Sequence, residues 1–297
     1  MASAQHGAMA PITSKISISA GEMVVSNVCK SYGTGLFEKK VVKDCSFSVE
    51  RGKLTVMIGP SGCGKSTLIK LLAGFEKPTS GSILLNGKPV TGPGRDRLVV
   101  FQESALFPWM TSYDNIMYGP IARGENDQKA RDLAEFLLDK VGLRDFRSKY
   151  PMQLSGGMQR RAELARAMIN NPEVMILDEP FRGLDAMSKE LMWEYYSALY
   201  EESRRTTFFV TTDIDEALFL ADRLIIMSNI PTRVRATIEV DIPRPRKLAD
   251  FFLGDRANEV KMTALSLLHE EAMRSFAGGS KAAADFVESY ARRSQRA

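Results

Sequence analysis

The sequence has little cysteine and almost no histidine. Its three cysteines, Cys29, Cys45 and Cys63, are too few and too irregularly spaced for a disulfide framework or a zinc site. We therefore expect them to be small buried residues in a reducing compartment. The two histidines, His6 and His269, lie near the two ends of the chain. Chemistry in the middle of the chain must therefore proceed without an imidazole.

Long apolar runs and strong charge of one sign are also missing. The longest apolar stretches, such as 206–212 and 174–177, fit strands and fall far short of the ~20 residues of a membrane-spanning helix. The 40 basic and 36 acidic side chains leave a net charge of +4, which is too small for a chain that coats nucleic acid. Residues 1–20 lack the basic leader and apolar segment of a secretory signal, so we expect a flexible, solvated tail.

Strand-like and helical segments alternate along the middle of the chain. Strands are expected at 23–25, 41–42, 47–49, 54–58, 98–102, 174–177, 207–210 and 224–227. Helices are expected at 66–73, 127–141, from 155 onward, and at 188–202 and 215–221. This alternation predicts a parallel sheet with right-handed crossovers. Asn86-Gly87 predicts a hairpin turn, and the helical block 102–161 is expected to be an insertion into the α/β core.

A glycine-rich segment follows the predicted strand 54–58 and precedes the predicted helix 66–73. It reads GPSGCGKST from Gly59 to Thr67 and satisfies the pattern G-x-x-x-x-G-K-[ST]. Its glycines let backbone N–H groups converge on phosphate oxygens, and the following helix presents its positive end. Lys65 adds a charge at the β- and γ-phosphates, and the Ser66 hydroxyl can bind Mg²⁺. The motif predicts a nucleoside triphosphate site rather than a plain glycine-rich turn.

Two carboxylates follow the buried strand 174–177. Asp178 and Glu179 stand at its carboxyl end, where α/β sheets bind ligands. Asp178 can hold Mg²⁺, and Glu179 can orient or deprotonate an attacking water. Strand-end acids also cap helices, but a triphosphate site needs a metal partner, which favours the catalytic interpretation.

A third motif, LSGGMQRR, begins at Leu154. Ser155, Gly156 and Gly157 could form only a helix cap with a permissive turn. The same residues also make a second anion cradle. These residues come after the glycine-rich segment 59–67, which we call the P-loop, and before Asp178. That order favours the anion cradle over a simple helix cap.

With these three motifs the chain resembles the ATP-binding subunits of ABC transporters from about residue 22 to 245. The segments VVFQESALFPWMTSYDNI and DEPFRGLDA are most similar to the importer branch that serves nitrate, sulfonates and taurine. The resemblance implies an α/β fold with a RecA-like P-loop core, an N-terminal antiparallel β portion and an inserted helical subdomain. It divides the chain into a tail (1–20), an ATPase domain (21–245, with the insertion at about 102–161) and a helical C-terminal extension (246–297). That extension is either regulatory or structural.

The resemblance also assigns site residues. It implies an adenine-stacking role for Tyr32, a catalytic role for Gln102 next to Mg²⁺ and water, and a D-loop position for Asp185. The catalytic set is then Glu179, Gln102 and Thr212, and the metal set is Ser66, Gln102 and Asp178. The expected nucleotide-binding residues are Tyr32, Gly59, Pro60, Ser61, Gly62, Cys63, Gly64, Lys65, Ser66, Thr67, Ser155, Gly156, Gly157 and Asp185.

One position departs from the family in a way that bears on catalysis. The family has a histidine where this chain has Thr212, and threonine supplies no positive charge. Two hypotheses remain: hydrolysis with Glu179 as base and Thr212 as a weak γ-phosphate contact, or ATP acting mainly as a dimerising ligand with vestigial hydrolysis. Two further departures, Met158 and Gly183, are mild.

The resemblance further implies partners and a location. Two copies, identical or related, would pack head to tail, so that Ser155 and Gly157 of one cover the ATP bound to Lys65 of the other. The subunit would lie at the cytoplasmic face of the inner membrane, beside permease subunits and indirectly a secreted or periplasmic solute-binding protein, with no nucleic acid. Phe107 and Trp109 either dock a permease helix or belong to the core. Lipid transport and export are the alternative transport roles. ABC ATPases that act in DNA repair without a permease usually carry a coiled-coil insertion or two ATPase halves in one chain, and this sequence shows neither feature.

Overall fold

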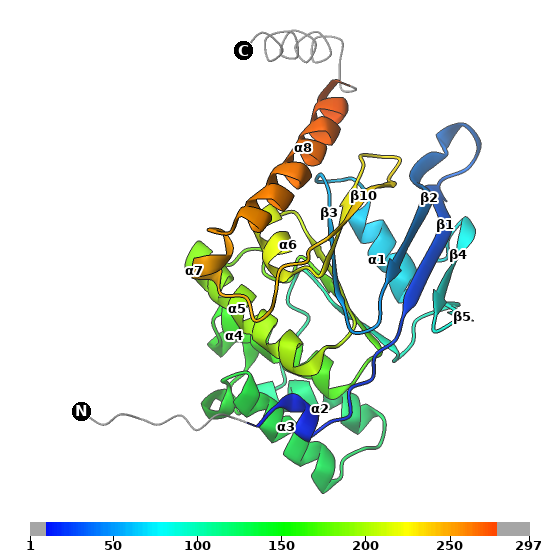
Figure 1. Ribbon diagram of the computed structural model, residues 1–297. Helices are drawn as coiled ribbons and strands as arrows, with labels where there is room; N and C mark the ends of the chain where they lie inside the picture. Colours follow the sequence, from blue (N-terminus) through cyan, green and yellow to red (C-terminus); the bar gives the residue numbers. More distant parts are fainter. Residues whose placement is uncertain (1–9, 278–297) are drawn as a thin grey trace.

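The computed structural model describes residues 10–277, whose strands form two sheets (Figure 1). The larger sheet has the order β10-β9-β3-β8-β7-β6. Its strands are β3 (Leu54–Ile58), β6 (Arg97–Val100), β7 (Val174–Asp178), β8 (Thr207–Thr211), β9 (Arg223–Met227) and β10 (Val234–Glu239). The first five run parallel to one another, and β10 pairs with β9 in the antiparallel sense. The predicted parallel sheet and α/β fold class are confirmed.

Both faces of this sheet are buried, which explains the unbroken apolar runs in its central strands. In β8, Phe209 contributes to one hydrophobic cluster, while Phe208 and Val210 contribute to the other. The first cluster also contains residues of the helices α4 (Gly156–Ile169), α5 (Ala186–Ser203) and α6 (Ile214–Leu220). The second contains α1 (Lys65–Ala73), which lies between the two sheets.

The smaller sheet is antiparallel and has the order β2-β1-β4-β5. Its strands are β1 (Met23–Tyr32), β2 (Lys39–Val49), β4 (Ser80–Leu85) and β5 (Lys88–Pro89). The strands β1 and β2 are longer than the sequence pattern indicated, because irregular pairing with Asn27 and Asp44 at positive φ interrupts the alternation of side chains. Asn86 and Gly87 both have positive φ between β4 and β5, which confirms the predicted hairpin turn.

The helical block between β6 and β7 starts with α2 (Ser112–Ala122) and α3 (Gln128–Lys140). Thr111 and Asp114 form a capping box at α2, and Asp127 caps α3. Figure 1 shows both helices at the end of the molecule opposite α8 (Asp255–Ala277). The α4 helix then returns the chain to the sheet.

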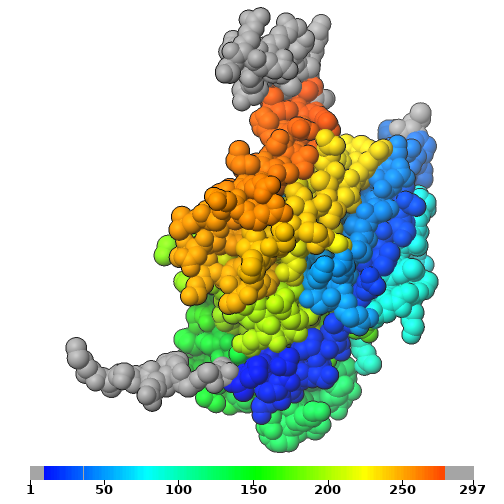
Figure 2. Space-filling model, in the orientation of Figure 1, coloured from blue at the N-terminus to red at the C-terminus, as the bar shows by residue number. Residues whose placement is uncertain are grey.

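The expectation of a solvated tail over residues 1–20 is wrong for its second half. Ile12 is fully buried in the core, and Ile16 and Ile18 pack against the same cluster. Asn171 holds the segment by accepting a hydrogen bond from the Ser19 backbone N–H. Figure 2 shows the segment lying on the folded chain, and residues 1–9 lie outside the described part. Apolar side chains at 12, 16 and 18 drive this packing.

The chain after β9 forms β10, α7 (Leu248–Phe251) and α8. The strand β10 was not predicted, although its residues VRATIE alternate between half-buried and exposed. Ala257, Val260 and Ala264 of α8 are buried in the main core cluster. Residues 278–297 of the expected helical extension lie outside the described residues.

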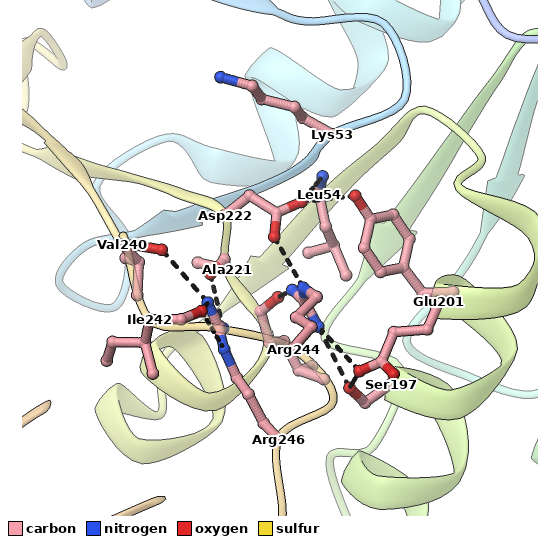
Figure 3. A network of polar contacts seen from close by, with 12 residues as sticks. Lys53, Leu54, Ser197, Glu201, Ala221, Asp222, Val240, Ile242, Arg244 and Arg246 are labelled. Carbon is pink, nitrogen blue, oxygen red and sulfur yellow. Dashed lines mark hydrogen bonds and ion pairs between the residues drawn. The ribbon is translucent and has the colours of Figure 1, made fainter. Parts of the chain in front are cut away.

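Two arginines fasten the segment after β10 to the rest of the fold (Figure 3). Arg244 Nε lies 2.8 Å from Asp222 Oδ1. Arg246 is buried and donates hydrogen bonds to the main-chain oxygens of Leu218, Phe219, Ala221, Val240 and Ile242. The oxygens of Leu218, Phe219 and Ala221 lie in the last turn of α6 or directly after it. Arg246 therefore donates to carbonyl groups that a helix end leaves without partners.

Candidate functional site

The carboxyl ends of neighbouring parallel strands bring the sequence motifs to one edge of the larger sheet. In the register of β3 and β8, Ile58 lies opposite Thr211, directly before the P-loop and Thr212. In the register of β8 and β7, Asp178 lies opposite Val210. The next strand, β6, leads into the loop that carries Gln102. Residues that are far apart in the sequence therefore share one ligand-binding edge.

The P-loop has the backbone that an anion cradle requires. Gly62 and Gly64 have φ values of 75° and 104°, which only glycine adopts without strain. A Cβ atom on Gly64 would lie 2.7 Å from Thr232 Oγ1. The helix α1 begins directly after Gly64 and has no side-chain cap. The N–H groups of its first turn are thus left for a ligand, and their positive end favours phosphate.

Lys65 lies within this loop and is only 6 % exposed. Its Nζ donates hydrogen bonds to the main-chain oxygens of Gly59 (2.8 Å) and Pro60 (3.0 Å). Phosphate oxygens can replace these two neutral acceptors with charged ones, which makes stronger hydrogen bonds. Ser61 and Ser66 are exposed, Thr67 is half-buried, and Cys63 is buried beneath the loop.

Asp178 lies close enough to that cation for the Lys65 charge to act on its carboxyl group, and Glu179 follows it in the chain. Burial, then the charge of Glu179, raises the pKa of Asp178 to about 6, and the Lys65 charge opposes the rise. Glu179 is buried at a φ of 42°, and its N–H donates to Val210 O at 2.8 Å. The backbone thereby fixes the carboxylate in a strained turn.

The donor set fits magnesium only when phosphate completes it. Within residues 10–277 no group of three or more His, Cys, Asp and Glu side chains could hold a metal ion. Oxygen ligands are what Mg²⁺ prefers, and it commonly takes one or two carboxylates plus substrate phosphates. Asp178 and the Ser66 hydroxyl are the matching groups here.

Gln102 and an arginine that the sequence analysis missed lie next to Glu179. Arg182 Nη1 lies 3.0 Å from Glu179 Oε2 and 3.5 Å from Gln102 Oε1. The Gln102 main-chain oxygen accepts a hydrogen bond from Arg160 Nη2 at 2.7 Å, which ties this loop to α4. The sequence signal that could have identified Arg182 is its position three residues after Glu179, because a turn brings such residues together.

The third motif forms a separate surface. Ser155 caps α4 by accepting from the Met158 N–H, and Asp185 caps α5 by accepting from the Ser188 N–H. A Cβ on Gly156 would lie 3.3 Å from Leu184 Cδ2, so the two helix starts are neighbours. In the part of the chain that the structure describes, the hydrogen bonds of Ser155 and Asp185 go to their own helices rather than to the P-loop.

Tyr32 stands at the end of β1 with an exposed ring. Its hydroxyl donates to Glu76 Oε2 at 2.7 Å, and Lys30 Nζ lies 5.0 Å from the ring centroid. Burial and the hydrogen bond to Glu76 raise the pKa of Tyr32. The hydroxyl is therefore anchored while the ring stays accessible for stacking.

Thr212 is exposed in the turn after β8. Its neighbours hold this turn firmly: Asp213 caps α6 and pairs with Lys189 Nζ at 2.6 Å, and the Thr211 hydroxyl donates to Glu216. The side chain of Thr212 is therefore presented from a fixed backbone, although it brings no charge.

A P-loop beside a strand-end acidic pair defines a P-loop nucleoside triphosphatase. The family profile described as ABC transporter matches residues 42–182. Together with relatives that are 36–42 % identical and match most of their own length, this shows that the chain belongs to the ABC transporter family of ATP-binding proteins. It is an ATPase.

Relatives with a named solute include a nitrate import protein and a bicarbonate transport protein. The nitrate import ATP-binding protein NrtD of Synechococcus elongatus is 40 % identical over 85 % of this chain and 93 % of its own. The bicarbonate transport ATP-binding protein CmpD of Synechocystis is 42 % identical over 75 % of this chain and 80 % of its own. A solved dimeric ATP-binding cassette bound to ADP and Pi matches with a TM-score of 0.63 and 28 % identity, over 74 % of this chain and all of its own.

Two further findings concern the surface. No helix within residues 10–277 is long and apolar enough to cross a membrane. A groove of about 390 Å³ lies between β6, α2 and α4, and Phe107 and Tyr118 are among the residues that line it. Trp109 is 70 % exposed with its ring 5.5 Å from that of Phe107, so it is not a core residue.

Proposed function

We propose that this chain is the ATP-hydrolysing subunit of an importer for a small solute of the nitrate, sulfonate or taurine type. The observation that carries the proposal is that Lys65 follows β3 and that Asp178 and Glu179 stand at the end of β7, so that they share one edge of the sheet on either side of β8. The names of two relatives support the solute class, since one is a nitrate import protein and the other a bicarbonate transport protein. The subunit would act at the cytoplasmic face of the inner membrane with permease subunits and, indirectly, a solute-binding protein.

From this geometry we infer how each group acts on ATP. The P-loop N–H groups and the start of α1 bind the β- and γ-phosphates, and Lys65 exchanges its loop carbonyls for phosphate oxygens. Ser66 and Asp178, together with Gln102, would hold Mg²⁺, whose positive charge would offset that of the phosphates. Glu179 orients the water and accepts its proton as the water oxygen bonds to the γ-phosphorus and the bond to ADP breaks.

The second anion cradle requires another copy of the subunit. Ser155 and Gly157 stand on a surface of their own, and the solved neighbours with 28–29 % identity are dimers. We infer a head-to-tail homodimer, or a heterodimer with a related subunit, in which this surface covers the ATP of the other copy. The groove beside Phe107 and the exposed Trp109 would receive the permease.

The test is phosphate release and solute uptake by the subunit with its permease in liposomes. Glu179→Gln is expected to lower phosphate release at least about 100-fold, because the positioned base is lost. Glu259 forms an exposed ion pair with Arg256 on α8. Glu259→Gln is therefore the matched control and should leave the rate of phosphate release unchanged. Glu179→Gln with Mg-ATP should also shift the protein from monomer to dimer in light scattering.

A second candidate function follows from Thr212, which puts a neutral, exposed side chain where the family has histidine. In it, ATP mainly holds the dimer closed and hydrolysis is vestigial. Equally slow phosphate release by the wild type and Glu179→Gln would favour this function over the first. A protein that stays monomeric with Mg-ATP and permease would contradict both.

A further inference from the structure

The carboxylate assigned as the base is already paired with a cation. Arg182 Nη1 lies 3.0 Å from Glu179 Oε2, and the same nitrogen lies 3.5 Å from Gln102 Oε1. A short turn joins the two residues, since the Arg182 N–H donates to Glu179 O at 3.1 Å. The guanidinium thus spans the two side chains that would face the attacking water.

The two partners differ in freedom. The Glu179 side chain is 10 % exposed and its backbone is fixed at Val210, whereas the Arg182 side chain is 61 % exposed. An exposed arginine can exchange partners by rotating its side chain without disturbing the core. The mobile member of the pair is therefore the cation.

The charges around the γ-phosphate position show what such a cation would supply. Lys65 serves the inner side of the phosphates from within the loop, and Thr212 adds no charge at the end of β8. A γ-phosphate carries more negative charge than a carboxylate and accepts the planar guanidinium in bidentate fashion. It would compete with Glu179 for Arg182.

Resting on the proposed function, we propose that Arg182 is a switchable cation. It holds Glu179 and Gln102 while the γ-phosphate position is empty. When ATP binds, it moves to the γ-phosphate, supplies the positive charge that Thr212 lacks, and releases the Glu179 carboxylate toward the water. ADP, which has no γ-phosphate, leaves the ion pair intact.

The experiment compares binding of ATP and ADP to purified protein, without turnover, by calorimetry in EDTA. Arg182→Ala should weaken ATP binding about 10-fold while ADP binding stays unchanged, because only ATP presents the group that Arg182 contacts. Arg182→Lys should retain part of the preference. Arg256→Ala, another arginine in an ion pair three residues from its glutamate, is the matched control.

Steady-state hydrolysis with the permease gives the second readout. Arg182→Ala should lower kcat about 10²-fold or more, and Thr212→His should restore more activity to this variant than it adds to the wild type. An unchanged ATP-to-ADP preference in Arg182→Ala, or faster hydrolysis, would overturn the inference. A wild type that does not hydrolyse ATP contradicts the proposed function instead, and the binding comparison still tests Arg182.

Discussion

Trp193 Nε1 donates a hydrogen bond of 2.7 Å to Oε1 of Glu216, and the Thr211 hydroxyl donates to the other oxygen of the same carboxyl group. Glu216 is 2 % exposed, and burial is the main reason that its pKa rises to about 7. One buried carboxyl group thereby joins α5 to the turn that presents Thr212.

Glu216→Gln should change how stability depends on pH. The folded pKa of Glu216 is raised from 4.5 to about 7, so the folded state binds the proton more tightly than the unfolded state. Stability from this group is present below about pH 4.5 and falls as pH rises to about 7, by up to about 3 kcal/mol. A neutral glutamine removes that fall. Urea unfolding at pH 5 and pH 8 measures it, and parallel profiles of wild type and variant would contradict the expectation.

Metal-dependent nucleotide binding should weaken in mild acid. Burial and the charge of Glu179 raise the pKa of Asp178 to about 6, so protons compete with the cation below that pH. Affinity for Mg-ATP should fall as pH drops from 7 to 5, and Asp178→Asn should weaken binding at pH 7 and flatten the profile. Calorimetric titrations with Mg-ATP, and with ATP in EDTA as the control, measure this. A wild-type profile as flat as that of the variant would exclude Asp178 as the titrating ligand.

Thr212→His should raise ATP turnover. The turn around position 212 is held by the Lys189–Asp213 pair, so an imidazole there would be presented from a fixed backbone and could donate to the γ-phosphate. Thr212→Val, which removes the hydroxyl and keeps the shape, is the control and should lower turnover. Steady-state phosphate release measures both. Unchanged or lower rates for Thr212→His would count against a γ-phosphate contact at this position.

Arg246→Ala should destabilise the fold by about 3–5 kcal/mol, because it leaves buried carbonyl groups without donors. The five main-chain oxygens that Arg246 serves lie on α6 and around β10. The exposed Arg256 offers a control. Replacing it with alanine should lower the free energy of unfolding by about 0.5 kcal/mol or less. Urea unfolding curves compare the two, and equal losses would show that Arg246 is no more important than a surface arginine.

The sequence predicted the parts of the fold that local patterns determine. The strand Leu54–Ile58, the following glycines and the helix from Lys65 carry their own signals: five buried apolar residues, a positive-φ loop and a helix start. The acidic pair at the end of β7 was also predictable, because the apolar run of the strand stops at these two residues.

Other features depended on contacts between distant segments. The burial of Ile12 requires the core under α5, which lies far away in the sequence. The irregular pairing at Asn27 hides the alternation of β1. From the sequence alone, Arg182 is indistinguishable from an ordinary surface arginine. In the structure, the turn after Glu179 brings its guanidinium group to the Glu179 carboxylate. Pairwise geometry, and not residue type, identifies it.

The attachment of Arg246 bears on where an autonomous folding unit ends. The family profile stops at residue 182, and the strands that complete the sheet follow it. Yet the last carbonyls of α6 find their donors in a side chain at position 246. A gene shortened to the end of β10 would encode every strand and still leave one helix terminus exposed, so the smallest independently stable fragment must extend through Arg246.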